Sequence, residues 1–166
     1  EFDVMKKDEI LCHISLNVPG KHNILNTLAA IAVCDIYNID LEKAARGIEK
    51  FHGTHRRFEK KGTVNGADVI ADYAHHPTEI KATLSAAKDL NYKDVIAVFQ
   101  PFPFSRTALL KDEFIKALSI ADKVILTPIM GSREINTYGI KSEDLAEKLD
   151  CAVVVDGFEN IADKMI

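Results

Sequence analysis

Residues 72–78 place a carboxylate, a phenol and two imidazoles together where a predicted strand ends. These side chains are Asp72, Tyr73, His75 and His76. They follow the apolar run 69–71, and Pro77 then opens a helical pattern. Proline suits the first helical position because its missing N–H would be unpaired there in any case. Ligands of open α/β sheets bind at the carboxyl ends of the strands, so this segment is a candidate binding site.

Two further polar segments, 100–107 and 130–138, follow predicted strands in the same way. The first joins two prolines to a predicted helix start that Ser105 could cap, where free N–H groups and the helix dipole favour an anion. Arg106 adds a charge that can bind a carboxylate or phosphate through two parallel hydrogen bonds. Composition alone is equally compatible with a proline-stiffened loop that carries a solvated arginine.

The adjacent histidines have several possible roles. Neighbouring side chains point in different directions, so one imidazole at most is expected in a given site, and the other can cap the following helix. A metal centre needs further ligands at compatible spacing, and the remaining histidines (His13, His22, His52 and His55) do not provide it, so no metal ligand is assigned. Asp72 can accept a hydrogen bond from a ribose hydroxyl, as acidic residues do in dinucleotide-binding folds.

A second group lies near the start of a predicted helix, where His22, Asn23 and Asn26 are neighbours at three- and four-residue spacing. Side-chain amides can pair with a nucleobase edge, although helix capping and simple exposure explain the same residues. Arg56 and Arg57 are either phosphate contacts or exposed strand residues. No G-x-x-x-x-G-K-[ST] phosphate loop occurs, so this chain alone is not expected to hydrolyse ATP or transfer its phosphate.

Composition excludes several broad classes. The chain has 166 residues, 47% of them apolar and 28% charged, with a net charge of −4. This balance offers no basic excess for nucleic acid, and no apolar run reaches membrane-spanning length. The three cysteines are odd in number and lack paired spacing, which favours a reduced, cytoplasmic protein.

The hydrophobic pattern predicts two regions. The first contains a hairpin of strands 2–5 and 11–16, a helix through residue 37, and a second helix that Asp40 caps. From about residue 54 onward the expected strands are 56–60, 67–71, 95–99, 124–126 and 152–155. The expected helices are 77–90, one capped by Ser105, 142–149 and a last one over 159–166. Short apolar strands between amphipathic helices predict a mostly parallel α/β sheet with helices on both faces. Both ends look cut, and one more strand would complete the alternation.

Taken in order, these segments resemble the Mur ligase family. The matching motifs are Asn17-Val18-Pro19-Gly20-Lys21-His22-Asn23 with Asn26, Gly53 with Arg56-Arg57-Phe58-Glu59, Asp72-Tyr73-Ala74-His75-His76-Pro77-Thr78-Glu79, and Phe99-Gln100-Pro101 with Ser105-Arg106-Thr107. Each motif alone is modest, whereas the ordered set is specific. Within the family, the motifs are most similar to the branch that joins L-alanine to UDP-N-acetylmuramate.

The resemblance implies a three-domain, ATP- and magnesium-dependent ligase of peptidoglycan synthesis that works through an acyl phosphate. Residues 1–52 would be the tail of the central ATP-binding domain, and residues 53–166 a Rossmann-like C-terminal domain whose last strand is missing. The remaining part would hold the phosphate loop and the magnesium ligands, so the fragment alone is expected to be inactive. Alternatives are the murein tripeptide ligase of cell-wall recycling, and a non-catalytic nucleotide- or peptide-binding module with this fold.

The resemblance also implies residue roles. His22, Asn23 and Asn26 would border the adenine. Arg57 would face the nucleotide phosphates and Asp72 the ribose or the hinge region. The side chains towards the muramoyl and alanine end would be Tyr73, His75, His76, Ser105 and Arg106. Arg57, Asp72 and Arg106 are the expected catalytic residues, with Arg106 on a carboxylate. Family members usually have a polar, basic stretch where this chain has Phe102-Pro103-Phe104. We therefore expect apolar packing around the small alanine side chain there in place of polar substrate contacts.

Overall fold

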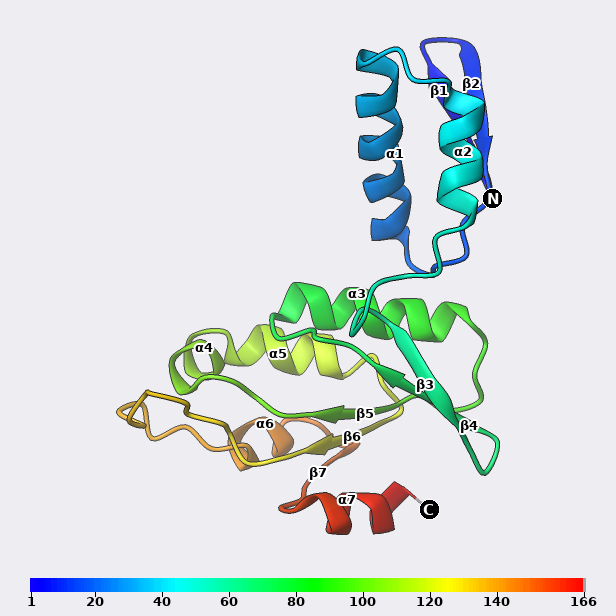
Figure 1. Ribbon diagram of the computed structural model, residues 1–166. Coiled ribbons are helices and arrows are strands. Elements are labelled where there is room, and N and C mark those ends of the chain that lie inside the picture. Colours follow the sequence, from blue (N-terminus) through cyan, green and yellow to red (C-terminus); the bar gives the residue numbers. More distant parts are fainter. Residues whose placement is uncertain (166) are drawn as a thin grey trace. The chain divides into compact units, whose positions relative to one another are not determined.

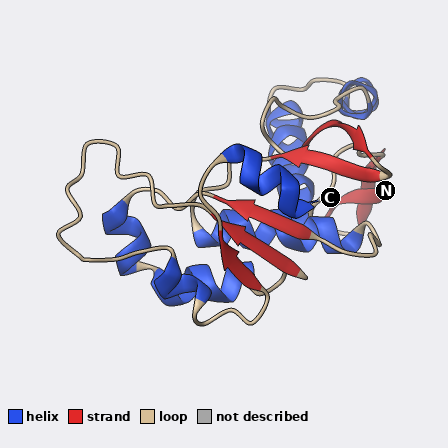
Figure 2. Cartoon of the chain, turned by 90° about the horizontal axis from the view of Figure 1, so that it is seen from below, coloured by secondary structure: helices blue, strands red, loops and turns tan. Residues whose placement is uncertain are grey.

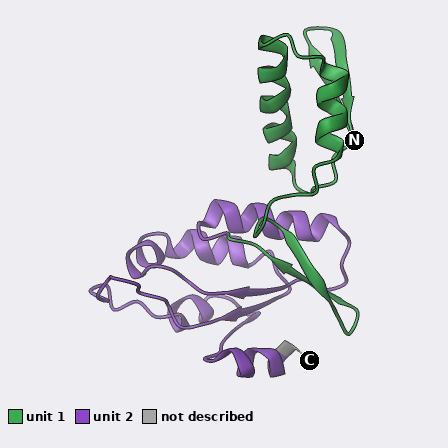
Figure 3. Ribbon diagram, in the orientation of Figure 1, with its two compact units in different colours: residues 1–73 green, residues 74–166 purple. Residues whose placement is uncertain are grey.

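The computed structural model describes residues 1–165 (Figure 1). The chain divides into two compact units, Glu1–Tyr73 and the part from Ala74 onward (Figure 3). Each unit has its own strands and helices. The predicted domain assignment, 1–52 and 53–166, remains a prediction.

The first unit begins with a small layer of two strands and two helices. Strands β1 (Phe2–Lys6) and β2 (Glu9–Ile14) pair antiparallel, and helices α1 (Lys21–Ile36) and α2 (Leu41–Glu49) follow. Its buried residues are Val4, Cys12, Ile14, Ile31 and Ala45. The Asp40 carboxylate accepts a hydrogen bond from the Lys43 N–H and caps α2. The predicted hairpin, both helices and this cap are confirmed.

The unit ends with a second hairpin, formed by β3 (Glu59–Val64) and β4 (Ala67–Ala71). Asn65 and Gly66 both have positive φ, as a two-residue type I′ turn requires. This tight turn pairs β4 antiparallel with β3, so the expectation that 67–71 joins the parallel sheet is wrong for the described residues. The predicted strand 56–60 is also misplaced, because Arg56 and Phe58 adopt left-handed φ values of 57° and 47° and form a turn.

The second unit is a parallel sheet in the order β5-β6-β7. Its strands are β5 (Ile96–Phe99), β6 (Lys123–Leu126) and β7 (Ala152–Val154). Its helices are α3 (Pro77–Asp89), α4 (Phe104–Leu109), α5 (Lys111–Leu118), α6 (Glu143–Ala146) and α7 (Phe158–Met165). Helices α3 and α5 lie on one side of the sheet and α7 on the other (Figures 1 and 2). The predicted parallel α/β sheet with helices on both faces is confirmed.

The main core lies on the α3 and α5 side of this sheet. Val124 and Leu126 of β6 pack there with Phe114 and Leu118 of α5, all of them almost fully buried. The alternate residues of the neighbouring strands are more open: Val98 is 44% exposed and Val153 48%. One face of the sheet therefore carries most of the hydrophobic stabilisation.

Three helix starts show how local chemistry sets the elements. His76 caps α3: its Nδ1 accepts a hydrogen bond from the Thr78 N–H, and Glu79 accepts one from the His76 N–H. The predicted cap by Ser105 is wrong, because α4 begins at Phe104 with Pro103 before it. Ser142 does not cap α6 through its side chain either, since its buried hydroxyl donates to the Thr127 carbonyl oxygen.

Two expectations meet the limits of the described residues. The final helix over 159–166 corresponds to α7, and residue 166 lies outside the part that the structure describes. Among residues 1–165, no helix combines the length and apolar character needed to cross a membrane.

Candidate functional site

The carboxyl ends of β5 and β6 bring two of the three polar segments together. The Thr127 N–H donates to the Phe99 carbonyl oxygen at 3.1 Å, and the Met130 N–H donates to the Pro101 carbonyl oxygen at 3.0 Å. These bonds continue the parallel pairing beyond the strand ends. Segments 100–107 and 130–138 therefore meet at one edge of the sheet, where ligands of α/β folds bind.

Arg106 lies half-buried on α4 and connects this edge to the histidine segment. Its Nη1 group donates to the His75 carbonyl oxygen at 3.3 Å and to the Phe102 carbonyl oxygen at 3.4 Å. The structure thus joins two predicted site segments of the second unit, 74–76 and 100–107. A guanidinium carries five N–H donors, so anchoring through Nη1 is compatible with binding an anion through the others.

Ser105 is held by a residue that the sequence analysis did not single out, Glu134. Its carboxylate accepts hydrogen bonds from the Ser105 N–H at 2.8 Å and from the Ser105 hydroxyl at 2.6 Å. These two bonds, together with the positive charge of Arg106, hold the pKa of the Glu134 carboxyl below its ordinary value. Segment 130–138 therefore holds the Ser105 end of segment 100–107.

The two histidines have different surroundings. His76 is exposed, and its ring is used in the cap of α3. The half-buried His75 lies near Glu79, with 3.4 Å between the His75 Nδ1 and a Glu79 carboxylate oxygen. Glu79 also accepts a hydrogen bond from the His75 N–H at 3.0 Å. Of the pair, His75 is therefore the better placed to contact a ligand through its ring.

In the first unit, the end of β4 holds a turn that carries Arg57. The Asp72 carboxylate accepts a hydrogen bond from the Phe58 N–H at 2.8 Å. The Tyr73 N–H donates to the Arg56 carbonyl oxygen at 2.8 Å. The guanidinium carbon of Arg57 lies 5.9 Å from the centroid of the Tyr73 ring, within the range of a cation–π interaction. Arg57, Asp72 and Tyr73 thus form one group, and their roles towards a ligand remain predictions.

Glu59 stabilises the same turn from the other side. One carboxylate oxygen accepts a hydrogen bond from the Arg56 N–H at 2.8 Å, and the other lies 2.8 Å from the Lys61 ammonium. The Lys61 bond, the Arg56 N–H and the nearby His55 lower the pKa of Glu59 to about 2. Two carboxylates therefore hold the backbone on either side of Arg57.

The predicted adenine group lies at the start of α1. Gly20 precedes this helix with a φ of 97°, and a Cβ there would come within 2.6 Å of the His22 ring. The Asn23 amide donates to the Pro19 carbonyl oxygen at 2.6 Å, and the Asn26 amide donates to the Asn23 side-chain oxygen at 3.3 Å. The three side chains are adjacent, with His22 and Asn26 exposed. The hydrogen bonds of Asn23 and Asn26 keep these two amides within this first turn.

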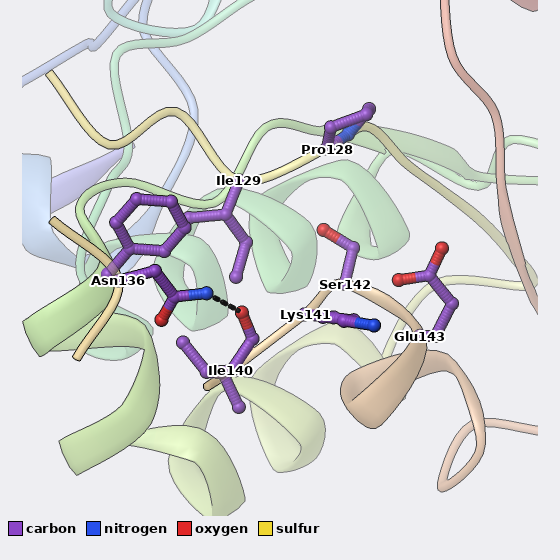
Figure 4. Close-up of a pocket in the computed structure, with 8 residues that line it drawn as sticks. Pro128, Ile129, Asn136, Ile140, Lys141, Ser142 and Glu143 are labelled. Carbon is purple, nitrogen blue, oxygen red and sulfur yellow. Dashed lines mark hydrogen bonds between the residues drawn. The ribbon is translucent and has the colours of Figure 1, made fainter. Parts of the chain in front are cut away.

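A pocket of about 200 Å³ lies beside the predicted substrate edge in the second unit (Figure 4). Its lining consists of Phe104, Pro128, Ile129, Asn136, Ile140, Lys141, Ser142 and Glu143. The Asn136 amide donates to the Ile140 carbonyl oxygen at 2.9 Å, and its own side-chain oxygen is buried without a hydrogen-bond partner among residues 1–165. Phe104 is partly buried against the core.

The described residues do not supply a metal centre. Within residues 1–165, no group of three or more His, Cys, Asp or Glu side chains is arranged to hold an ion. The carboxylates nearest the site are already engaged with backbone N–H groups, as Asp72 and Glu134 show. Magnesium therefore does not fit this chain's own residues as a resident ion.

The sequence comparisons place this site in a family. A sequence model described as "Mur ligase, glutamate ligase domain" matches residues 56–165. The chain belongs to the Mur ligase family. It is 48% identical to a UDP-N-acetylmuramate–L-alanine ligase of Caldicellulosiruptor saccharolyticus over the whole chain and 38% of that relative. It is 53% identical to the ligase of the same name from Lachnospira eligens, over 89% of this chain and 33% of the relative.

Solved structures agree with this family assignment. UDP-N-acetylmuramate–alanine ligase from Thermotoga maritima superposes with a TM-score of 0.77 and 32% identity, over 97% of this chain and 35% of its own. A murein peptide ligase from Psychrobacter arcticus has a TM-score of 0.62 at 24% identity, over 92% of this chain and 32% of its own, which shows the shared fold alone. The chain spans about a third of the length of the relatives that it matches.

Proposed function

We propose that this chain is part of an ATP-dependent ligase that joins L-alanine to UDP-N-acetylmuramate in peptidoglycan synthesis. The observation that carries the proposal is the 48% identity to alanine-adding Mur ligases along the whole chain. The site geometry supports it, because Arg106 and His75 meet at the carboxyl edge of the sheet. A cytoplasmic location belongs to the same proposal, since ATP and a UDP-linked acid are its substrates.

The proposed reaction has two steps. The muramate carboxylate attacks the γ-phosphorus of ATP, which releases ADP and forms an acyl phosphate. The neutral amine of alanine then attacks the acyl carbon, inorganic phosphate leaves, the nitrogen releases one proton to the departing phosphate or to solvent, and an amide bond forms. Negative charge gathers on the phosphate and on the tetrahedral intermediate, and positioned arginines stabilise such charge. Arg106 would bind the alanine carboxylate, with His75 and Ser105 beside it and His76 fixing the start of α3.

The first unit would serve the nucleotide. His22, Asn23 and Asn26 would border the adenine, and Arg57 would face the phosphates. Tyr73, next to Arg57, would lie towards the muramoyl and alanine end. In this structure Asp72 holds the Phe58 N–H, so its contribution to a ribose contact would come through placing Arg57 as well as through its own carboxylate. Magnesium would be held by residues outside this chain.

An assay of the complete ligase that contains this chain tests the proposal directly. With ATP, magnesium and UDP-N-acetylmuramate, we expect ADP release that depends on L-alanine and the appearance of the alanylated nucleotide by mass spectrometry. Glycine and D-alanine serve as amino-acid controls, and the 166-residue chain alone should release no ADP. Amino-acid-independent ATP turnover, or no turnover at all, would contradict the proposal.

The same assay separates the alternatives. A murein tripeptide ligase would use the tripeptide L-alanyl-γ-D-glutamyl-diaminopimelate in place of alanine. A non-catalytic binding module would bind nucleotide without releasing ADP. The relatives with 48% and 53% identity are alanine ligases, which favours alanine.

A further inference from the structure

Glu134 occupies a position for which the family comparison and the sequence motifs assign no role. It lies in the loop between β6 and α6, and both of its carboxylate oxygens accept hydrogen bonds from Ser105. The next residue along the chain from Ser105 is Arg106, whose positive charge also acts on Glu134. The carboxylate therefore binds the residue directly before Arg106.

The loop that carries Glu134 is itself fixed at several points. The Ser142 hydroxyl donates to the Thr127 carbonyl oxygen at 2.6 Å and ties the two ends of the loop together. The Met130 N–H binds the Pro101 carbonyl oxygen. Gly131 lies against the Phe104 ring so closely that a Cβ would come within 2.3 Å of it. Glu134 is therefore presented to Ser105 from an anchored loop.

We propose that Glu134 is a positioning residue that fixes the Arg106 guanidinium for the carboxylate of the incoming amino acid. It acts by holding the Ser105 end of α4 through two hydrogen bonds, which fixes the backbone from which the Arg106 side chain extends. The two bonds from Nη1 to the His75 and Phe102 carbonyl oxygens fix the other end of the same side chain. An arginine held in its binding conformation loses less entropy when it binds its ligand. The identity of that ligand rests on the proposed function.

Steady-state kinetics of the complete ligase test this role. Glu134→Ala removes both acceptors, and we expect the KM for alanine to rise roughly 10-fold, the scale of losing hydrogen bonds to a charged group. Glu134→Gln keeps one acceptor and gains one donor towards the Ser105 hydroxyl, so its KM should stay within about 3-fold of the wild type. The KM values for ATP and UDP-N-acetylmuramate should stay unchanged in both. Glu147→Ala, which removes another exposed carboxylate, is the matched control and should change none of them.

A double-mutant cycle shows whether Glu134 acts through Arg106. In an Arg106→Ala background, Glu134→Ala should raise the KM for alanine no further, because residues that act as one unit are not additive. Two results would overturn the proposal: an unchanged KM for alanine in Glu134→Ala, or a full additional effect in the Arg106→Ala background. A purely structural role would instead lower the melting temperature and the active fraction without a selective change in this KM.

A spectroscopic readout separates this proposal from the function on which it rests. If the wild-type ligase adds no amino acid, the proposed function fails, and the Arg106 Nε–H signal in an ¹⁵N-edited spectrum then decides the role of Glu134. The signal should shift and broaden in Glu134→Ala and keep its position in Glu134→Gln. An unchanged signal in Glu134→Ala would overturn the positioning role whatever the substrate.

Discussion

Next to both Arg57 and Arg106, backbone N–H groups donate hydrogen bonds to carboxylates. The carboxylates lie at very different distances along the chain from the two arginines. Glu59 is three residues from Arg56, and Asp72 is 14 residues from Phe58. Glu134 is 29 residues from Ser105 and belongs to the loop after another strand. The first arrangement is local to one hairpin, whereas the second depends on the assembled parallel sheet.

The backbone beneath the two arginines differs as well. Arg56 and Phe58 on either side of Arg57 have left-handed φ values, which cost non-glycine residues about 1–2 kcal/mol each. Arg106 lies on α4, where helical hydrogen bonds hold the chain without such strain. The turn at Arg57 therefore depends on its carboxylates in order to form. Helix α4 forms through its own hydrogen bonds, and Glu134 only fixes its position.

The largest expected effect separates the two arginines by substrate. In the complete ligase, Arg106→Ala should lower kcat/KM for alanine by roughly 10–100-fold, because a charge-assisted contact with a carboxylate is lost. Arg57→Ala should raise the KM for ATP by a similar factor and leave the KM for alanine in place. Initial-rate kinetics with each substrate varied in turn measure both effects. If Arg106→Ala has unchanged alanine kinetics, the carboxylate role is wrong, and lysine at either position tests whether charge alone suffices.

The second prediction removes the Asp72 carboxylate, which holds the turn at Arg57. Asp72→Ala should lower the free energy of unfolding by about 1–3 kcal/mol, because the Phe58 N–H loses its acceptor in a turn that is already strained. Asp72→Asn keeps a carbonyl oxygen at the same place and should cost less than half as much. Urea denaturation of the 166-residue chain measures both. Equal losses in the two variants would show that the charge of Asp72, rather than its acceptor oxygen, holds the turn.

The third prediction displaces the loop that carries Glu134. Gly131→Ala would place a Cβ against the Phe104 ring, so the loop or the ring must shift, at a cost of about 1–3 kcal/mol. Gly47→Ala is the matched control: beyond its chain neighbours and the backbone of its own helix, no atom of the described residues lies within 4 Å of the added Cβ in α2. Alanine there should stabilise the chain by about 0.5–1 kcal/mol. Thermal and urea unfolding report the signs, and a neutral Gly131→Ala would mean that the loop adapts freely.

The smallest expected effect is in pH dependence. Glu59 and Glu134 both have lowered pKa values, so their contributions to stability are fully present above the ordinary glutamate value and are lost as the pH falls through the folded one. For Glu59 this window lies between about 4.3 in the unfolded chain and about 2 in the folded chain. Side-chain carboxyl ¹³C signals measure both titrations. Lys61→Met should raise the pKa of Glu59 and leave the pKa of Glu134 unchanged. A shift in both pKa values would contradict the independence of the two carboxylates.

Features determined by neighbouring residues could be predicted from the sequence. The Asp40 cap and the α3 start at Pro77 each depend on side chains a few residues apart, and each is found where expected. The ordered motifs identified the family, and the described contacts join Arg57 to Tyr73 and Arg106 to His75. Residue roles at the site remain predictions.

Features determined by contacts between distant residues were missed. Ser105 and Ser142 have the residue type of a helix cap, yet their hydroxyls donate to Glu134 and to the Thr127 carbonyl oxygen instead. Glu134 carried no local signal beyond its place in a polar segment after a strand. The sequence does predict segment 130–138 to be a polar segment at the same sheet edge as Arg106. A charged side chain from this segment near Arg106 could be expected on that basis. The left-handed turn at Arg56 and Phe58 likewise gives no pattern, because neither residue type favours that conformation.

The short loop of the β3-β4 hairpin has a consequence for the order in which the chain matures. Two-residue hairpins close within microseconds once their strands exist, whereas parallel strands must wait for their crossover connections. As synthesis proceeds from the N-terminus, Arg57 can reach its final geometry soon after Tyr73 leaves the ribosome. Arg106 has to wait until Glu134 and strand β6 have followed. In a nascent chain, Arg57 would therefore be positioned well before Arg106.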